Sequence, residues 1–452
     1  MKLLKVHVHN YRHLKDVSLT FEPDLYPQVF AIGSENGGGK STLLQLIFTF
    51  LHCTPHSKLH KFAINAIQHM KSALEYWEEK IHQIIDIDLL DKDGKNISIS
   101  YLLYPVSSQE PENPENLSIY DAIHLLFQAE LLRKQISSLD SKKMLIETNL
   151  RGFIINNIED KIRKQELQVN LKSIREELGN LQEILEDIPI HEYRQLLLKE
   201  DLELLLFLNL PNFDKVSDYC LCCKLKSDSP LIGNDILTNM SKNILLAGQT
   251  TQPYIFLSDE SIRDMFNSDK TYEHTLENAR LEIGNLYNFN AFAIYEIIDA
   301  FKTAIEEDTK SMIKNGFYGS NFSELTKELK LLLGGNKEII PSAELDGLIV
   351  RYYVDNENYK ELSLGELSHG ELKRVCLYSW IRHNKATNSI VLIDEIENGL
   401  HPDWQYQIVK DLQEWGDNQY ILATHSFYLC EALTPRHVKE LAPKMSQPIL
   451  NK

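Results

Sequence analysis

Apolar and polar residues alternate along several short stretches near the start of the chain. Residues 2–8 alternate with a period of two, and residues 28–32 form an apolar run that leads into a glycine-rich loop. Residues 83–90 and 96–103 flank an Asp-Gly pair, which is typical of a tight hairpin turn. These patterns predict four strands, and a helix over residues 40–51 after the second of them.

The middle of the chain carries apolar residues at spacings of three and four instead. One series runs through Leu132, Ile136, Leu139, Ile146, Leu150 and Phe153, and a second through Leu171, Ile174, Leu178, Leu181, Leu185 and Ile188. Heptad seams must pack against another helix, and Gly152, Asn156 and Asn157 lie between them as helix breakers. Residues 122–199 are therefore expected to form either a helical hairpin with projecting arms or an ordinary helical bundle.

Strands and helices are both expected in the rest of the chain. The pattern predicts strands at residues 219–224, 253–257 and 345–354 and helices over residues 272–315. The last hundred residues alternate helix, strand, helix and strand.

The charge and composition of the chain disfavour several classes of protein. The 452 residues include 47 basic and 65 acidic side chains, a net charge of −18, which disfavours nucleic acid as the main ligand. No apolar run reaches the ~18–20 residues of a membrane span, and the first residues lack the apolar run of a signal peptide. The six cysteines show no disulfide framework, so a cytoplasmic location is expected.

The glycine-rich loop at residues 33–42 has the features of a phosphate-binding loop, because a predicted strand precedes it and a helix follows it. Glycines let backbone N–H groups surround phosphate oxygens, and the helix N-terminus adds partial positive charge. Lys40 is expected to reach the β- and γ-phosphates, and the Ser41 hydroxyl to bind Mg²⁺. The residues predicted to bind ATP are Ser34, Asn36, Gly37, Gly38, Gly39, Lys40, Ser41 and Thr42. Ser34 departs from the usual glycine.

A second group of polar residues follows two apolar runs near the end of the chain. Residues 391–393 lead into Asp394 and Glu395, and residues 420–423 lead towards His425. Buried parallel strands end at the ligand edge of a sheet. Asp394 is therefore predicted to hold Mg²⁺, and Glu395 to orient and polarise the attacking water.

Residues 367–371 resemble the signature motif of the ABC superfamily of ATPases. Its residues are Ser368, His369, Gly370 and Glu371, of which His369 replaces the more usual glycine or serine. The resemblance implies that these residues bind the γ-phosphate held by a second subunit. It also implies a D-loop at the dimer interface that contains Glu397, Asn398, Gly399 and His401, and a switch role for His425.

The order of the motifs and the Asp-Glu-Ile-Glu string at 394–397 are similar to the OLD, RecF and SMC branch of this superfamily. The resemblance implies an α/β fold: an ABC-type P-loop NTPase head, with a mixed sheet flanked by helices, and a long coiled-coil-like insertion. The expected domains are the N-terminal half of the head at residues 1–115, the insertion at 116–215, and the C-terminal half at 216–452. A further helical insertion at 260–335 is possible.

The resemblance extends to the stand-alone ATPase subunits of bacterial anti-phage systems such as PARIS and Septu. OLD nucleases continue into a TOPRIM domain, for which the residues after His425 are too few. The resemblance therefore implies ATP and Mg²⁺ as cofactors, homo-oligomers built from ATP sandwich dimers, a separately encoded TOPRIM or HNH nuclease and a phage protein as trigger. The alternatives are a DNA-repair or chromosome-maintenance ATPase that binds DNA, and the ATPase subunit of a transporter.

Three weaker features of the sequence have both a functional and a purely structural interpretation. Cys220 and Cys223 have the spacing of a zinc-binding pair, but the sequence has no second pair, so a short buried strand explains them better. The histidines after the first helix, His56, His60 and His69, are either a basic patch or a solvated helical face. A glutamine loop is placed only weakly, with Gln109 preferred to Gln68 and Gln128.

Overall fold

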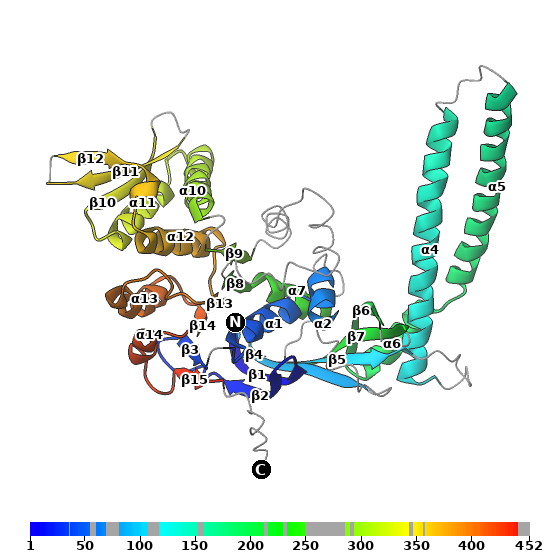
Figure 1. Ribbon diagram of the computed structural model, residues 1–452, viewed down its shortest axis with the longest axis horizontal. Coiled ribbons are helices and arrows are strands. Elements are labelled where there is room, and N and C mark those ends of the chain that lie inside the picture. The colour runs from blue at the N-terminus through cyan, green and yellow to red at the C-terminus, as the bar shows by residue number, and fades with distance from the viewer. Residues whose placement is uncertain are drawn as a thin grey trace, which may run out of the picture. The chain divides into compact units, whose positions relative to one another are not determined.

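The computed structural model describes residues 1–35, 37–54, 60–68, 81–106, 117–151, 158–211, 216–228, 233–248, 285–289, 293–342, 347–355 and 358–441. The chain forms two compact units, whose elements are labelled in Figure 1. The head unit contains Met1–Tyr76, Gln83–Tyr101 and Lys226–Lys452, and the insertion unit contains Trp77–His82 and Leu102–Leu225. The insertion therefore interrupts the sequence of the head.

A six-stranded parallel sheet is the centre of the head unit. Its strand order is β15 (Val438–Glu440), β3 (Val29–Gly33), β14 (Gln419–Ala423), β13 (Ile390–Asp394), β8 (Ile244–Gly248) and β9 (Leu286–Asn288). Every residue of β13 and β14 is buried, as expected for central strands covered on both faces. The strands next to β3 thus come from the far end of the sequence.

Helices cover both faces of this parallel sheet. Helix α1 (Lys40–Leu51) packs on β8, β13 and β14, and contacts α2 (His60–Gln68) and α7 (Gly233–Lys242). One buried cluster joins Val391 and Ile393 of β13 to Val375 and Trp380 of α12 (His369–His383). Helix α13 (Pro402–Glu414) contributes Ile408, Val409 and Leu412 to the same cluster, and α14 (Phe427–Glu431) contributes Leu429.

An antiparallel sheet is the second layer of the head unit. It places β2 (Leu14–Thr20), β1 (Lys2–Tyr11), β4 (His82–Leu90) and β5 (Asn96–Pro105) in that order. The predicted Asp-Gly turn connects β4 and β5, with Gly94 at φ +76°, a conformation that glycine adopts without steric cost. The hairpin expected from the sequence is therefore confirmed, with strands slightly longer than predicted.

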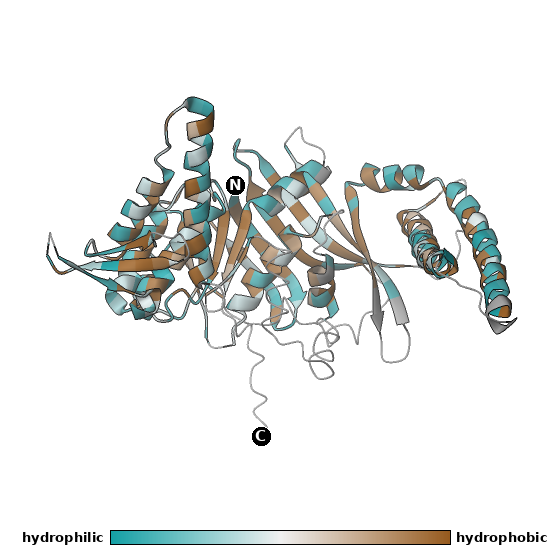
Figure 2. Cartoon of the chain, turned by 90° about the horizontal axis from the view of Figure 1, so that it is seen from above, coloured by the Kyte–Doolittle hydropathy of each residue, from teal (hydrophilic) through white to brown (hydrophobic). Residues whose placement is uncertain are grey.

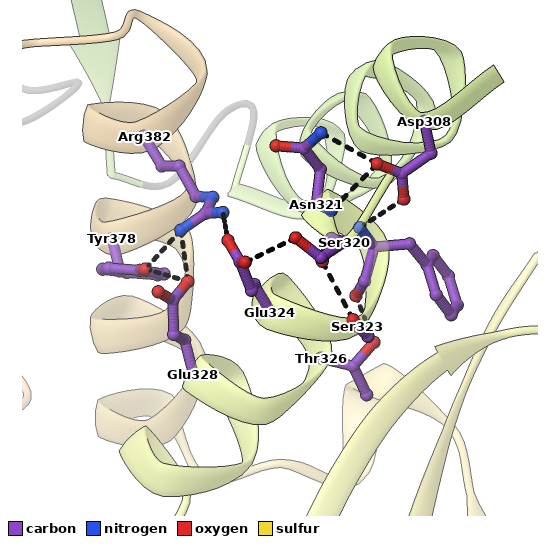
Figure 3. A network of polar contacts seen from close by, with 10 residues as sticks. Asp308, Ser320, Asn321, Ser323, Glu324, Thr326, Glu328, Tyr378 and Arg382 are labelled. Atoms are coloured by element: carbon purple, nitrogen blue, oxygen red, sulfur yellow. Dashed lines mark hydrogen bonds and ion pairs between the residues drawn. The ribbon is translucent and has the colours of Figure 1, made fainter. Parts of the chain in front are cut away.

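A helical lobe of the head contains α10 (Ala293–Asn315), α11 (Asn321–Leu332) and a small sheet of β10 (Lys337–Pro341), β11 (Leu348–Tyr353) and β12 (Tyr359–Leu362). Figure 3 shows the polar contacts that hold it. The buried carboxylate of Asp308 on α10 accepts hydrogen bonds from the backbone N–H groups of Asn321 and Phe322, both at 2.9 Å. On the other side of α11, Glu328 accepts from Tyr378 and Arg382 of α12. The lobe is thereby tied to α12.

The insertion unit is built on a helical hairpin. Helices α4 (Ile119–Arg151) and α5 (Ile158–Glu186) lie side by side, as Figures 1 and 2 show, and Arg175 donates to Glu147 between them at 2.8 Å. Leu171 and Leu178 of the predicted seam are buried. At its base, α6 (Ile190–Lys199) packs on β6 (Leu202–Pro211), which pairs with β7 (Val216–Ser227). Of the two expectations, the hairpin is the one observed.

Some expectations differ from the structure or lie outside it. Helices were expected over residues 272–315, and α10 occupies Ala293–Asn315, but Leu286–Asn288 within this range is the parallel strand β9. Strands β6 and β8 were not predicted, since their apolar runs are also compatible with buried helix. Residues 253–257, His56, His69 and Gln109 lie outside the described residues.

The cysteine pair is explained by strand geometry. Cys220, Cys222 and Cys223 are fully buried in β7, and Cys220 and Cys222 lie 3.4 Å apart between their sulfur atoms. Because side chains alternate along a strand, Cys220 and Cys223 point to opposite faces and do not converge on one metal ion. Across the described residues, no helix is both long and apolar enough to span a bilayer.

Candidate functional site

The carboxyl ends of three neighbouring strands bring the predicted residues together. Strands β3, β14 and β13 are adjacent and parallel, so the segments that follow them meet at one edge of the sheet. The glycine-rich loop follows β3, Asp394 ends β13, and His425 comes two residues after β14. This edge is the candidate site.

The glycine-rich loop turns sharply where no other residue fits. Gly37 and Gly39 have φ +77° and +90°, which side-chain-bearing residues rarely adopt. A Cβ atom on Gly39 would lie 2.6 Å from the side chain of Leu14. A Cβ atom on Gly38 would lie 2.3 Å from Oγ of Ser34. Gly38 and Gly39 therefore have no room for a side chain in this conformation, whereas Asn36 lies outside the described residues.

Lys40 lies at the centre of the site and is almost completely buried. Its Nζ donates to the carbonyl oxygen and the hydroxyl oxygen of Ser34, at 3.1 and 3.0 Å, and lies 2.9 Å from Nε2 of His425. Burial lowers the pKa of Lys40, and the carboxylates of Asp394, Glu397 and Glu395 oppose part of that shift. Ser34, which departs from the usual glycine, is thus a hydrogen-bond partner of the lysine.

Ser41 and Asp394 form an oxygen pair beside this lysine. The Ser41 hydroxyl donates to Oδ1 of Asp394 at 3.0 Å, across 353 residues of sequence. Mg²⁺ prefers hydroxyl, carboxylate and water oxygens, so the donor set at this position fits the ion. Thr42 follows Ser41 in the first turn of α1.

Glu395 is held in an unusual backbone conformation. Its φ is +51°, and its N–H donates to the carbonyl oxygen of Ala423 at 2.8 Å, one step beyond the end of the β13–β14 ladder. The side chain of Asn398 donates to Oε2 of Glu395 at 2.7 Å. Non-glycine residues with positive φ are often found at functional sites, where surrounding contacts hold them in place.

Lys373 of α12 stabilises the turn that contains Glu395, and its role was not predicted from the sequence. Its Nζ donates to the carbonyl oxygens of Glu395 and Asn398 at 3.1 and 2.9 Å, and lies 4.0 Å from the centre of the Phe289 ring. Burial lowers the pKa of Lys373 to about 8, against the opposing effect of Glu397, Glu395 and Asp394. A lysine among the apolar residues of a helix was the only signal in the sequence.

The loop after β13 contacts the loop after β14. Oε1 of Glu397 accepts a hydrogen bond from the backbone N–H of His425 at 2.7 Å. Gly399 has φ +80°, and a Cβ atom there would lie 2.2 Å from the ring of His369. His401 caps α13, with its Nδ1 accepting from the Asp403 N–H at 3.4 Å. The loop after β13 therefore fixes the backbone that carries His425.

The N-terminus of α12 carries the signature-like residues. Ser368 and Glu371 form a capping box, in which the Ser368 hydroxyl accepts from the Glu371 N–H and Glu371 accepts from the Ser368 N–H. Lys337 of β10 donates to Glu371 at 2.7 Å, and was not predicted from the sequence. A Cβ atom on Gly370 would lie 2.7 Å from Trp404 and 2.9 Å from the Gly399 carbonyl. This packing leaves Ser368 and His369 exposed.

Two family models match the chain. One, described as "AAA domain", matches residues 5–333, and the other, described as "AAA domain, putative AbiEii toxin, Type IV TA system", matches residues 257–431. The chain is also similar over 95 residues to two curated proteins. These are the "Retron Vc95 probable ATPase" of Vibrio cholerae serotype O1 biovar El Tor, with 37% identity, and the "Retron Ec83 probable ATPase" of Escherichia coli, with 32%. Each match covers 18% of this chain and 18% of the relative.

Solved structures of Smc head domains are also similar. The head with an extended coiled coil from Pyrococcus furiosus, bound to the C-terminal domain of ScpA, aligns over 95% of this chain and 91% of its own, with 12% identity and a TM-score of 0.33. The Smc head bound to the winged-helix domain of ScpA aligns over 96% of this chain and 92% of its own, with 10% identity and a TM-score of 0.37.

Proposed function

The chain belongs to the AAA domain family and is an ATPase, and on that premise we propose that two copies enclose ATP in a sandwich dimer whose state controls a partner nuclease. The observation that carries the nucleotide site is the convergence of Lys40, Asp394 and His425 from three neighbouring parallel strands. Phosphoryl transfer requires positioning and charge neutralisation rather than covalent chemistry by the protein. This arrangement supplies both.

Each side chain of the site has a distinct role in hydrolysis. The glycine-loop N–H groups and Lys40 bind the phosphates, and the ammonium group stabilises the charge that develops on the γ-phosphate. Ser41 and Asp394 would hold Mg²⁺, which supplies further positive charge to the phosphates. Glu395 orients the attacking water and accepts its proton. His425, at 2.9 Å from Lys40, faces the position of the γ-phosphate.

The amino end of α12 completes the site of the opposite copy. Ser368 and His369 are exposed, and Gly370 packs so closely on Trp404 and the Gly399 carbonyl that this position has no room for a side chain. A helix N-terminus of this kind binds anions through its N–H groups and dipole. It fits the γ-phosphate held by a second copy, with the loop containing Glu397, Asn398, Gly399 and His401 at the interface.

The same proposal assigns the α4–α5 hairpin to partner binding in anti-phage defence. Two relatives are named as ATPases of retrons, and the motif order resembles that of ATPase subunits that act with a separate nuclease. Exposed apolar residues on the hairpin, among them Met144, Leu145 and Val169, offer a contact surface. The partner is a TOPRIM or HNH nuclease, released when a phage protein is sensed.

The ATPase site is tested with Glu395→Gln, which keeps shape but removes the carboxylate. We expect this variant to bind ATP and to form dimers measured by light scattering, while phosphate release falls by a factor of at least 100, because the water is no longer activated. The matched control is Glu414→Gln, an exposed carboxylate at the end of α13, which should hydrolyse ATP as wild type does. Full hydrolysis by Glu395→Gln would refute the assignment.

The partner role is tested separately by co-expression with the neighbouring genes of the native operon. We expect a nuclease to co-purify with Glu395→Gln in the presence of ATP. If no nuclease co-purifies but the purified chain binds duplex DNA with a steep negative dependence on salt, the alternative of a DNA-repair or chromosome-maintenance ATPase replaces the proposal.

A further inference from the structure

A cluster of two histidines and two aspartates lies on the antiparallel sheet of the head unit. His7 and His9 belong to β1, Asp86 to β4, and Asp16 to the β2 strand that flanks β1 on its other side. Nε2 of His9 lies 2.7 Å from Oδ2 of Asp86, and Nε2 of His7 lies 3.1 Å from Oδ1 of Asp16. None of these residues takes part in the candidate nucleotide site.

Strand geometry places the four side chains together. His7 and His9 are two residues apart and therefore point to the same face of β1. Asp86 is the direct partner of His7 in the β1–β4 register, and its carboxylate is hydrogen-bonded to His9. The two rings are stacked with centroids 4.3 Å apart. The arrangement is thus set by the register of three paired strands.

Potential ligand atoms of His7, His9 and Asp86 all lie within 4.8 Å of one another. In a tetrahedral zinc site with bonds of ~2.0–2.1 Å, ligand atoms are about 3.4 Å apart. Binding of the ion would therefore draw the ligand atoms closer together through rotation of the three side chains. The side chains of His7, His9 and Asp86 are 24–31% exposed, so an ion can reach them from solvent.

We propose that this cluster is a zinc site, in which His7, His9 and Asp86 are ligands and Asp16 or a water molecule completes a tetrahedron. Two imidazoles and one carboxylate form a donor set that suits Zn²⁺ and does not suit Mg²⁺ or Ca²⁺, which prefer oxygen alone. The ion replaces the two histidine–aspartate hydrogen bonds, and any proton on a ligand nitrogen leaves to solvent. It links β1 to β4.

The test measures metal binding by the full chain without nucleotide. Protein treated with a chelator and dialysed is titrated with Zn²⁺, with stoichiometry measured by elemental analysis, and with Co²⁺, whose visible absorption reports tetrahedral coordination. We expect one ion per chain, and a loss of affinity of at least tenfold in His9→Ala and in Asp86→Asn. His191→Ala, which removes an exposed histidine on α6, should bind as wild type does.

Any of three outcomes would overturn the proposal. If folded wild type takes up no metal at micromolar zinc, or if a folded His7→Ala/His9→Ala double variant retains the wild-type stoichiometry, the cluster is not a zinc site. Circular dichroism verifies the fold of each variant, and Asp86→Asn, which preserves shape, answers the question if the double variant unfolds. Near-ultraviolet charge-transfer absorption from cobalt thiolate would locate binding at the cysteines instead and would also overturn the proposal.

Discussion

Lys373 carries a positive charge in a nearly closed environment beside three carboxylates. Its ammonium group donates hydrogen bonds to the backbone carbonyl oxygens of Glu395 and Asn398. It therefore stabilises the turn between these two residues and does not serve to bind the nucleotide. Glu395 has φ +51°, a conformation that costs free energy unless contacts stabilise it. Lys373 therefore acts as a positioning residue for Glu395.

Substitution Lys373→Met preserves the length of the side chain and removes its donors. We expect kcat for ATP hydrolysis to fall by about 10–100-fold, because a shift of about 1 Å in a catalytic group has an effect of this size. The KM for ATP should change little, since Lys373 contacts no atom of the phosphate-binding loop in the described hydrogen bonds. Steady-state kinetics measures both constants.

Lys360→Met, at an exposed position on β12, is the matched control and should leave kcat unchanged. An unchanged kcat in Lys373→Met would contradict the positioning role. An equal loss in the two variants would indicate a general effect of lost charge.

At the residue scale, the sequence motifs predicted which side chains lie together at the candidate site. They did not predict which other residues hold those side chains in position. The glycine loop, Asp394 and His425 follow recognisable strand patterns, so their convergence was predictable from topology. The contacts from Lys373 to Glu395 and from Lys337 to Glu371 join elements that are far apart in sequence and follow no periodic pattern. Such contacts depend on how α12 packs against the rest of the head unit. The residues around Lys373 in the sequence do not determine that packing.

Asp308 shows how one side chain fixes the relation of two helices. Its carboxylate on α10 caps α11 (Figure 3). A Cβ atom on Gly319 would lie 2.3 Å from its Oδ1, so the backbone at Gly319 passes close to this carboxylate. Burial alone would raise the pKa of Asp308, but hydrogen bonds from the backbone of Phe322 and from Asn321 lower it below its usual value. The charged form is thus favoured in the folded state.

Substitution Asp308→Ala should lower the free energy of unfolding by about 2 kcal/mol, because two backbone donors of α11 lose their acceptor. Because the pKa of Asp308 is lower in the folded state, its contribution is complete above about pH 4 and is lost as pH falls through the folded value. The difference in stability between wild type and variant should therefore shrink in acid. Urea unfolding at several pH values measures it.

Glu306→Ala, two residues away on the exposed face of α10, serves as the control because its described ion pair is with the exposed Lys310. Its free energy of unfolding should match that of wild type at each pH. A difference between wild type and Asp308→Ala that is constant down to pH 2 would contradict the assignment of the effect to the carboxylate charge.

At the scale of helices and strands, the hydrophobic periodicity was sufficient to predict an element when that element is long or is bounded by turn residues. The α4–α5 hairpin follows from its apolar spacing, and the β4–β5 hairpin follows from its alternation and from Gly94; the expected breakers Gly152, Asn156 and Asn157 lie outside the described residues. Short buried strands such as β8 and β9 were not predicted. Runs of five and three residues are too short to show whether their hydrophobic pattern repeats as in a strand or as in a helix. Their position in the sheet is decided by pairing with distant strands.

For the whole molecule, the proposed sandwich makes each ATP site depend on two chains. Lys40→Ala disables the phosphate-binding side of a site, and Ser368→Ala disables the side supplied in trans. We expect each variant alone to be inactive and a 1:1 mixture to recover about a quarter of wild-type hydrolysis, because half of the random dimers contain one intact site. Phosphate release by the mixture measures the recovery.

Dilution gives the independent control for this prediction. Wild-type turnover per chain should fall once the concentration drops below the dimer dissociation constant. If the mixture shows no recovery and turnover per chain stays constant on dilution, the ATP site is complete within one chain.

The position of β3 in the sheet has a consequence for synthesis of the chain. Both of its neighbours, β14 and β15, come from beyond residue 418, and Lys40 and His425 are 385 residues apart. At about 5–20 residues per second, a ribosome needs roughly 20–80 s to add that length. Throughout this interval the apolar strand β3 has neither partner, so the nascent chain exposes two unpaired strand edges of the kind that chaperones shield.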